Sequence, residues 1–431
     1  MRKFHSFVVL ATLIGVALLG SAAAGDDRDR DTDDIGPTVL ITDLVSNQAN
    51  LVDGNHILHP AAAIDPNLVN PWGITESPST KARPGSPFWI SDNNAGLSTL
   101  YSVPGANNTP VSINGLVVSI PVPGDPTGNK GAPTGDVFNI ANVTGTTAFP
   151  ISGVDRNGNP ITANAIFLFA TEDGTILGWN PGVNPIGFDP AKAGTYAIIA
   201  VDNSSNPTAA DGAVYKGLAI AKDASGNTFL YATNFRAGTV EVYDTGFHPK
   251  TFSSVQFVDE ELQVQDRHRE HKYAPFDVVP IGDKLYVTYA VQDKTRHDDK
   301  PGPHHGIVDT FDLQGGSQAR FTERGPLNSP WGVVQAPASF GQFAGDILIG
   351  NFRDGRINAF DATGAFLGPV VNPLGQPILI DGLWSLKTGN DGNGGNSQTI
   401  YFTAGPNGEK DGLFGSLTPV APGTPCGPTC I

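Results

Sequence analysis

Histidine and aspartate gather in two neighbouring segments of the sequence. The first reads QDRHREHKY (residues 265–273) and the second reads VQDKTRHDDKPGPHHG (291–306). Neutral imidazole nitrogens and carboxylate oxygens are ligands for Zn²⁺, Cu²⁺ or Ni²⁺. The candidate ligands are His268, His271, His297, Asp298, Asp299, His304 and His305. HxxH spacing alone has low specificity, so a solvated, pH-sensitive loop is the alternative interpretation of these residues.

A second set of candidate ligands consists of carboxylates and amides that follow short apolar runs. They are Asp92, Glu172, Asn234 and Asn351. Oxygen ligands of this kind suit Ca²⁺ or another hard cation if the fold brings them together. The alternative is that Asp and Asn at these places only form turns. Together the two sets predict a divalent cation, Ca²⁺ or Zn²⁺, as the cofactor to look for.

Other chemical motifs are absent from the sequence. It contains no HExxH, no GxSxG and no P-loop. The segment DRNGNP (155–160) begins like a calcium loop, but Pro160 stands where glycine is needed and Ile166 where glutamate is needed. The only cysteines are Cys426 and Cys430, so the body of the chain has no thiol nucleophile. In an exported protein these two cysteines could pair locally.

The elements that must position the candidate ligands repeat along the chain. VNPWGIT (69–75) returns as NSPWGVV (328–334). Each phrase is followed by two further apolar strands, and the same succession of three strands occurs six times. The first strands of the six copies are NPWGIT (70–75), GDVFNIA (135–141), VYKGLAIA (214–221), APFDVVPI (274–281), SPWGVV (329–334) and GLWSLKTG (382–389). We interpret PWG first as a structural repeat, in which Gly permits close approach near an axis and Trp packs between neighbouring units.

A fourth strand is visible in five of the six copies. These strands are GLVVSIPV (115–122), YAIIAVD (196–202), SSVQFVDEE (253–261), ARFTERG (319–325) and PILI (377–380). The last copy lacks one, and TVLITDLV (38–45) could supply it. The sequence therefore predicts an all-β fold, a six-bladed β-propeller with four-stranded antiparallel blades, in which the N-terminal strand closes the last blade.

Propeller geometry places the candidate ligands on one face. Loops that enter the innermost strands and loops that follow the second strands share this face, which we call the top face. Both candidate sets are therefore expected there, together with residues at the starts of the inner strands. The latter are Asn70, Asp136, Lys216, Asn328 and Asp381.

The repeated segments resemble a known family. NLVNPWGI (67–74), FWISDNNAGLSTLY (88–101), LYATNFRAGTVEVYD (230–244), RGPLNSPWGVV (324–334), GNFRDGRINAFD (350–361) and IYFTAGPNGEKDGLFGSL (400–417) are similar to an uncharacterised family of exported bacterial propellers. Some members carry an exosortase-type sorting tail, which this C-terminus, CGPTCI, lacks. More remotely, the architecture is similar to NHL-repeat and gluconolactonase-like propellers, which bind a divalent metal on the axis. The resemblance implies a propeller and no specific activity.

The two ends of the chain predict export. Residues 1–24 read as a signal peptide, with Arg2 and Lys3 before an apolar run. Residues 25–37 are an acidic linker, 38–420 the propeller and 421–431 a flexible tail with cysteines. We expect a secreted or periplasmic monomer with no membrane span after cleavage. The net charge of −16 argues against nucleic acid as a partner.

Three function classes remain open from the sequence. The first is a binding scaffold that presents its top-face loops to a protein, a glycan or a small molecule, with or without a bound cation. The alternative is a metal-dependent lactonase or esterase with a cation at the channel mouth. In it, Glu172 or Asp92 would be a ligand or base, and Asn234 and Asn351 would be ligands. A quinone-binding redox propeller is a third class, for which the sequence offers no cofactor fingerprint.

Overall fold

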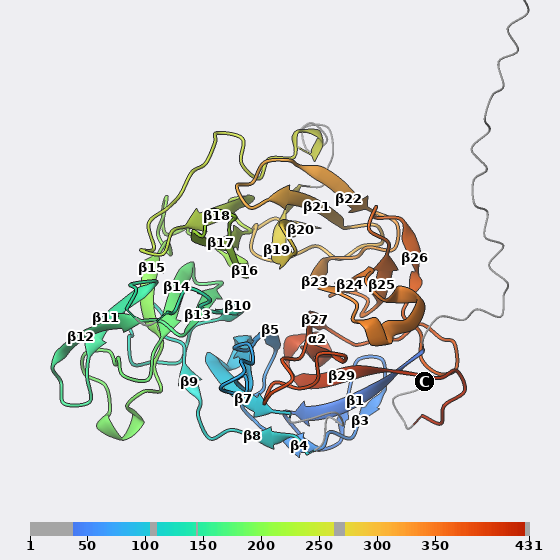
Figure 1. The fold of residues 1–431 in the computed structure, drawn as a ribbon, viewed down its shortest axis with the longest axis horizontal. Helices are drawn as coiled ribbons and strands as arrows, with labels where there is room; N and C mark the ends of the chain where they lie inside the picture. The colour runs from blue at the N-terminus through green and yellow to red at the C-terminus, as the bar shows by residue number, and fades with distance from the viewer. Residues whose placement is uncertain (1–37, 104–109, 144, 263–271, 427–431) are drawn as a thin grey trace, which may run out of the picture. The chain divides into compact units, whose positions relative to one another are not determined.

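The six predicted repeats form six small sheets around a common axis (Figure 1). The structure, a computed structural model, describes residues 38–103, 110–143, 145–262 and 272–426. Strands dominate this part of the chain, and the sheets are antiparallel apart from a short parallel edge pair. The all-β, six-bladed propeller is confirmed. Within the described ranges, no helix has the length and apolar character that a membrane-spanning segment requires.

The blades follow one another along the chain. Blade 1 contains β5 (Pro71–Thr75), β6 (Phe88–Asp92), β7 (Leu97–Ser102), β8 (Ser112–Ile113) and β9 (Val118–Ser119). Blade 2 contains β10 (Pro133–Phe138), β13 (Phe167–Thr171), β14 (Thr175–Trp179) and β15 (Ile198–Asp202). Blade 3 contains β16 (Tyr215–Lys222), β17 (Thr228–Asn234) and β18 (Thr239–Tyr243).

The second half of the ring repeats this arrangement. Blade 4 contains β19 (Tyr273–Ile281), β20 (Lys284–Val291), β21 (Ile307–Asp312) and β22 (Ala319–Glu323). Blade 5 contains β23 (Pro330–Gln335), β24 (Ile347–Asn351), β25 (Ile357–Phe360) and β26 (Phe366–Pro369). Blade 6 contains β27 (Leu383–Thr388), β28 (Ile400–Ala404), β29 (Leu413–Val420), β1 (Thr38–Ser46) and β4 (Ala63–Ile64). Two hairpins stand apart, β2 (Leu51–Val52) with β3 (Leu58–His59) and β11 (Pro150–Val154) with β12 (Pro160–Asn164).

The N-terminal strand closes the ring, as the sequence predicts. β1 pairs antiparallel with β29, from Thr38 opposite Val420 to Ser46 opposite Leu413. The first and last strands of the propeller are thereby joined by a full ladder. Closure of this kind covers a sheet edge that would otherwise invite pairing with another chain.

Two of the predicted fourth strands are wrong. Residues 253–261 form no strand, and the sheet of blade 3 has three strands. The reason is Phe257, whose φ of 54° breaks an extended backbone while its ring packs on Tyr231 and Phe311. In blade 5 the fourth strand is β26 rather than 377–380, because β26 follows β25 through a short turn and reaches the open edge first.

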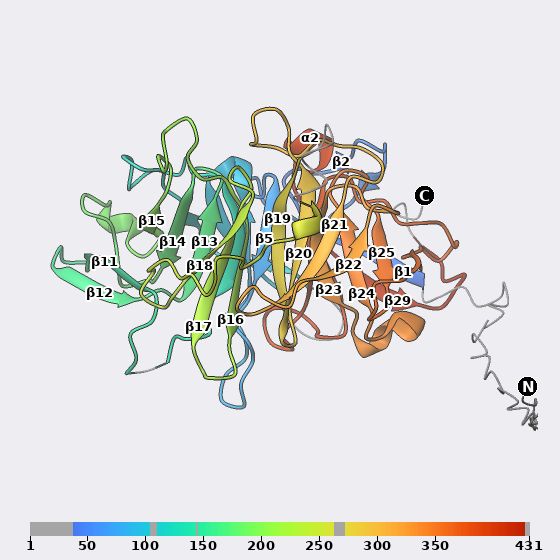
Figure 2. The ribbon, with the colours of Figure 1, turned by 90° about the horizontal axis from the view of Figure 1, so that it is seen from above.

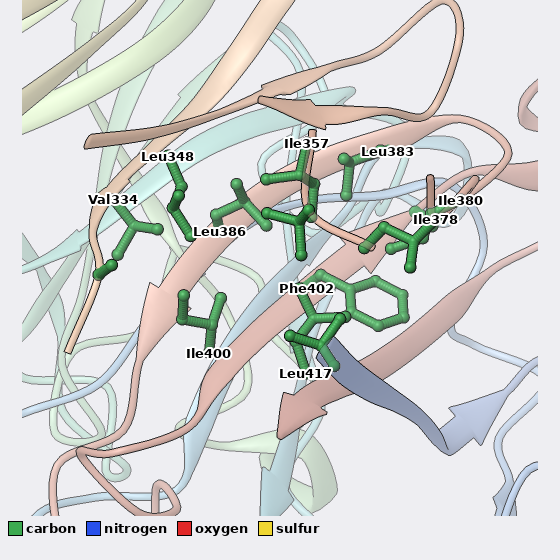
Figure 3. Close-up of a cluster of buried hydrophobic side chains, with 14 of the residues drawn as sticks. Val334, Leu348, Ile357, Ile378, Ile380, Leu383, Leu386, Ile400, Phe402 and Leu417 are labelled. Atoms are coloured by element: carbon green, nitrogen blue, oxygen red, sulfur yellow. The ribbon is translucent and has the colours of Figure 1, made fainter. Parts of the chain in front are cut away.

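Apolar side chains fill the spaces between neighbouring blades. Figure 3 shows the seam between blades 5 and 6, where Ile378 and Ile380 of the wrongly predicted strand lie in the core. The other labelled residues of this cluster are Val334, Leu348, Ile357, Leu383, Leu386, Ile400, Phe402 and Leu417. Each blade therefore depends on its neighbours for burial, as in other repeat folds.

All six inner strands share an irregularity near the top face. The ladder between the first and second strand shifts register at one place in every blade. The shifts lie at Pro71/Ile74, Pro133/Asp136, Tyr215/Gly217, Pro275/Asp277, Pro330/Val333 and Leu383/Leu386. Such bulges bend a strand and redirect its side chains.

Glycine at this bulge permits the close approach of neighbouring blades. A Cβ on Gly73 would lie 2.5 Å from the Thr134 carbonyl oxygen of blade 2, and one on Gly332 would lie 2.5 Å from the Trp384 carbonyl oxygen of blade 6. These distances are too short for any side chain. They explain why the PWG phrase ends in Gly in blades 1 and 5.

Candidate functional site

The tryptophans of the repeated phrase meet on the propeller axis. Trp72 stacks on Trp384 with ring centroids 3.5 Å apart, and Trp331 meets both rings edge-on at 6.1 and 5.9 Å. Phe352 also stacks on Trp384, with ring centroids 3.7 Å apart. We call the buried set Trp72, Phe235, Phe276, Trp331, Phe352 and Trp384 the axial aromatic cluster. It forms an apolar floor beneath the loops of the top face.

A lysine replaces the tryptophan at the equivalent position of blade 3. Tyr215-Lys216-Gly217 matches Pro71-Trp72-Gly73 at the bulge. The Lys216 side chain is 2% exposed, and its Nζ lies 5.0 Å from the ring centroid of Trp72. Nζ donates to Glu172 Oε1 and, at 3.2 Å, to Asp298 Oδ1. Burial disfavours the ammonium, but the two carboxylates outweigh it and raise the pKa of Lys216.

Lys216 is therefore a fixed positive charge on the axis, held by two carboxylates. Glu172 follows β13, and Asp298 lies in the loop between β20 and β21. Glu172 Oε2 also accepts a hydrogen bond from Asn93 Nδ2 at 2.9 Å. Both carboxylate oxygens of Glu172 are thus engaged.

His297 completes a group of three possible metal ligands. One ligand atom from each of Glu172, His297 and Asp298 lies within 4.8 Å of the others. His297 Nδ1 is 3.0 Å from Asp298 Oδ1 and 4.0 Å from Glu172 Oε1. The hydrogen bond with His297, together with Lys216, holds the pKa of Asp298 well below its usual range. Asp298 therefore stays ionised and available as a ligand.

Blades 1, 5 and 6 add further polar groups. Trp384 Nε1 donates to Asn70 Oδ1 at 2.9 Å, and Asn70 Nδ2 donates to Glu409 Oε2 at 3.0 Å. Arg353 donates to both carboxylate oxygens of Asp299, at 2.5 and 2.7 Å. Burial raises the pKa of Glu409, which belongs to the short helix α2 (Pro406–Glu409) on the top face (Figure 2).

Every blade thus contributes to one polar group above the aromatic floor. We call it the top-face mouth and define it as Asn70, Asn93, Glu172, Lys216, His297, Asp298, Asp299, Arg353 and Glu409. Its charged members are four carboxylates, one lysine and one arginine. The mouth carries a net negative charge when its carboxylates are ionised.

The structure brings only Glu172 of the first predicted ligand set to the mouth. Asp92 is fully buried, and its carboxylate lies near Tyr101 of the same blade and near Asp65, which follows β4. Asn234 donates to Glu241 Oε1 at 2.7 Å. Asn351 donates to the Pro326 carbonyl and to Asp354. The two amides order their own loops.

The second predicted set is also divided. His297 and Asp298 adjoin each other, whereas Asp299 pairs with Arg353. The ring of His304 contacts the Gly325 carbonyl at 2.6 Å, and that of His305 contacts the Lys300 carbonyl at 3.1 Å. His268 and His271 lie outside the described residues.

Sequence reasoning missed Glu409 as a member of the mouth. It lies in PNGEKDG, in the loop that follows the second strand of blade 6, whereas Glu172 comes directly after its strand. Glu409 is separated from the strand by Gly405, Pro406, Asn407 and Gly408. A rule that takes residues at the strand end therefore did not select it.

Comparison with known proteins identifies relatives of unknown activity. No family model matches the chain. The uncharacterised protein R648 of Acanthamoeba polyphaga mimivirus is 32% identical over 381 residues, which cover 88% of this chain and 80% of that protein. The uncharacterised protein L690 of the same virus is 32% identical over 370 residues, covering 85% and 84%. This chain belongs to their family. These relatives are viral, so the comparison does not support the expected bacterial membership.

Three solved structures resemble this chain over most of its length. The α-L-arabinanase of Penicillium chrysogenum is 11% identical, with a TM-score of 0.46 and coverage of 89% of this chain and 99% of that one. The calcium-binding regucalcin of Agrobacterium tumefaciens is 10% identical, with a TM-score of 0.41 and coverage of 82% and 93%. A streptogramin B lyase is 10% identical, with a TM-score of 0.39 and coverage of 87% and 97%. At these values the likeness concerns the fold alone.

The donor set of the mouth decides which cation it suits. Ca²⁺ takes oxygen ligands, whereas an imidazole with two carboxylates suits Zn²⁺ or another first-row transition ion. Glu172, His297 and Asp298 therefore fit Zn²⁺ better than Ca²⁺. The Lys216 ammonium already neutralises part of their charge and opposes a second cation.

Proposed function

We propose that this chain is a binding scaffold whose top-face mouth takes a divalent transition-metal ion and, with it, a small polar ligand. The observation that carries the proposal is the group Glu172, His297 and Asp298, whose ligand atoms lie within 4.8 Å of one another. Two further features support it. The mouth has excess negative charge, and the side chains of His297 and Asp298 are 37% and 60% exposed, so a ligand can reach them.

The axial aromatic cluster supports a binding role for the same place. It gives the mouth a rigid, buried floor, and preorganised groups on rigid elements bind with little ordering cost. Polar side chains from six different blades surround this floor. A small molecule with several hydrogen-bonding groups is the ligand class that such a surface suits.

Metal binding must compete with the Lys216 ammonium. Lys216 donates to Glu172 and Asp298, which are two of the three candidate ligands. The metal therefore binds less tightly than in a site without an internal cation, and its affinity should rise when the lysine is removed. This competition also separates a real site from a chance cluster, because a chance cluster would not respond to Lys216.

The hydrolase alternative receives less support from the same contacts. A general base must have a free oxygen directed at water or substrate. Lys216 and Asn93 engage the two oxygens of Glu172, so this residue is poorly placed as a base. The proposal therefore assigns Glu172 the role of ligand.

Export and a monomeric state belong to the proposal as well. Residues 1–24 have the pattern of a signal peptide, although residues 1–37 lie outside the described ranges. Sequencing the N-terminus of the protein recovered from the medium or periplasm tests cleavage near residue 24. Recovery of only the full-length chain inside the cell would contradict export.

The metal proposal is tested on the mature protein purified without a His tag. Elemental mass spectrometry gives its metal content before and after chelation, and thermal melting is recorded on each sample. We expect one transition-metal ion per chain and a lower melting temperature after chelation. Absence of stoichiometric metal, together with no response of the melting curve to added Zn²⁺, would contradict the proposal.

A further inference from the structure

A second cavity lies on the axis below the aromatic cluster. It has a volume of about 800 Å³ and is lined by all six inner strands. Its lining begins at or just past the bulges, at Gly73, Gly135, Leu218, Asp277, Trp331 and Ser385, one from each blade. It continues along these strands to the loops that follow them, including Ser79 and Asn390. We call this cavity the lower channel.

The lining of the lower channel includes residues with buried carboxylates. Asp136 lines it and is 6% exposed, and neither of its carboxylate oxygens has a hydrogen-bond partner among the described residues. Asp277 lines it from blade 4 and is 4% exposed. Glu76 pairs with Lys387 at 3.3 Å through one oxygen, while its other oxygen is buried without a partner. Ionised, these four groups leave the channel with a net negative charge.

The unpartnered carboxylate of Asp136 needs an explanation. A buried polar group without a partner costs free energy, and native proteins keep few of them. Burial raises the pKa of both Asp136 and Asp277 well above the usual range, although the charge of Lys387, which pairs with Glu76, opposes the rise at Asp136. A cationic ligand in the channel would supply a counterion.

The chemistry of the walls separates an organic cation from a metal ion. Among the described residues the only three-ligand group within 4.8 Å is the one at the top-face mouth, so Glu76, Asp136 and Asp277 do not converge on one ion. The surfaces between the carboxylates are apolar and include Ile74, Leu218, Val278, Val333 and Leu386. Apolar walls with separated acids suit a ligand with an aliphatic body and ammonium ends.

We propose that the lower channel binds an aliphatic diamine, with one ammonium group at Asp136, the other at Asp277 and the carbon chain along the apolar walls. This site is separate from the top-face mouth, because the axial aromatic cluster lies between them. It goes beyond the proposed function and shares with it only Trp331 of the aromatic floor. Either site can fail without the other.

The test is isothermal titration of the full chain with 1,5-diaminopentane, with 1,5-pentanediol as the neutral probe of the same length. We expect saturable binding of the diamine, none of the diol, and stronger binding as the pH rises, because binding requires ionised Asp136 and Asp277. Asp136→Asn and Asp277→Asn should each weaken binding by about tenfold or more, since each removes a charge-assisted hydrogen bond.

Asp92→Asn is the matched control. Asp92 is as deeply buried as Asp136 and its oxygens also lack hydrogen-bond partners among the described residues, but it does not line the lower channel. Its variant should bind the diamine like the unchanged protein. Asparagine has nearly the same shape as aspartate, so the variants should fold, and their melting curves check this.

Four results would overturn the proposal. They are the absence of saturable diamine binding, equal binding of the diol, binding that Asp136→Asn leaves unchanged, and loss of binding in Asp92→Asn. A further result would also overturn it. If the protein binds Ca²⁺ saturably but not the diamine, and Asp136→Asn abolishes this binding, the ligand of the channel is a metal ion rather than a diamine.

Discussion

Within the described part of the chain, buried charged groups at the top-face mouth are paired, whereas a buried carboxylate of the lower channel is not. At the top-face mouth, the Lys216 ammonium pairs with Glu172 and Asp298, and hydrogen bonds link most of the surrounding groups. In the lower channel, Asp136 has no partner among the described residues although it is almost fully buried. The same six inner strands build both ends of the propeller axis. At the bulge each strand passes from residues that meet at the aromatic cluster, such as Trp72, to residues that line the channel, such as Ile74.

This difference determines how each end can bind a ligand. A charge that is already paired must exchange its partner to bind a ligand, so the mouth binds by competition. An unpaired carboxylate gains its first partner from a ligand, so a cationic ligand in the channel displaces no existing partner. Variants that alter one end and spare the other test this distinction.

Removing the floor between the two ends should have the largest effect. Trp384→Ala deletes a ring that stacks on both Trp72 and Phe352. We expect a loss of about 4 kcal/mol in the free energy of unfolding, from lost burial and the cavity that remains. Urea unfolding measures it, with the half-exposed Phe366→Ala as control. A loss below about 1 kcal/mol would mean that the cluster is not a structural floor.

Removing the internal cation should have the next largest effect. Lys216→Met leaves Glu172 and Asp298 without their buried partner, and we expect a loss of about 3 kcal/mol. Added Zn²⁺ should restore part of the melting temperature, because the vacated carboxylates become free to bind it. The exposed Lys192→Met is the control. Unchanged stability, or no response to Zn²⁺, would contradict the competition between lysine and metal.

His59 offers a second buried cation between two carboxylates, far from the axis. Its ring nitrogens lie 3.1 Å from Asp43 and 3.4 Å from Asp53. Burial opposes the imidazolium, but the two neighbouring carboxylates prevail and raise the pKa of His59 to about 9.

The pH dependence follows from this raised pKa. Stability from His59 is fully present below pH 6.5, its unfolded value, and is lost as the pH rises through about 9. We expect His59→Gln to cost about 2 kcal/mol near pH 6 and much less at pH 10. Urea unfolding across this range measures the difference. A difference that does not change with pH would show that His59 is not a buried cation in the folded state.

Neutralising the unpaired acid of the lower channel should have the smallest effect and the opposite sign. The folded-state pKa of Asp136 is raised, so the unchanged protein loses stability as the pH rises above the unfolded value of 3.8. Asp136→Asn removes this loss, and we expect it to be about 1 kcal/mol more stable near pH 7 and no more stable below pH 4. Thermal melting at both pH values checks the sign. Destabilisation at pH 7 would indicate that the carboxylate has a partner.

The sequence predicted the ring well because each blade repeats the same local pattern. NPWGIT, SPWGVV and their equivalents became inner strands with bounds that differ by at most three residues, and TVLITDLV became the closing strand. The errors concern outer strands. There, pairing depends on which segment of the chain first lies beside the open edge of the blade. Residues 253–261 have an apolar pattern, yet Phe257 is used for packing rather than for pairing.

The candidate site was predictable only in part. The strand-end rule selected Glu172, and the starts of the inner strands selected Asn70 and Lys216. The rule places residues on a face but does not fix the direction of each side chain. Asp92 points into the blade and Asn234 toward Glu241 for this reason. The axial contact between Lys216 and Trp72 joins blades 1 and 3, which no local pattern reveals.

Titration of the metal-free protein with Zn²⁺ tests the central claim most directly. The same titration is made with His297→Ala and Lys216→Met. The account predicts one site in the unchanged protein, loss of that site in His297→Ala and tighter binding in Lys216→Met. Two results would contradict it. In one, neither the unchanged protein nor Lys216→Met binds Zn²⁺; in the other, His297→Ala retains full binding.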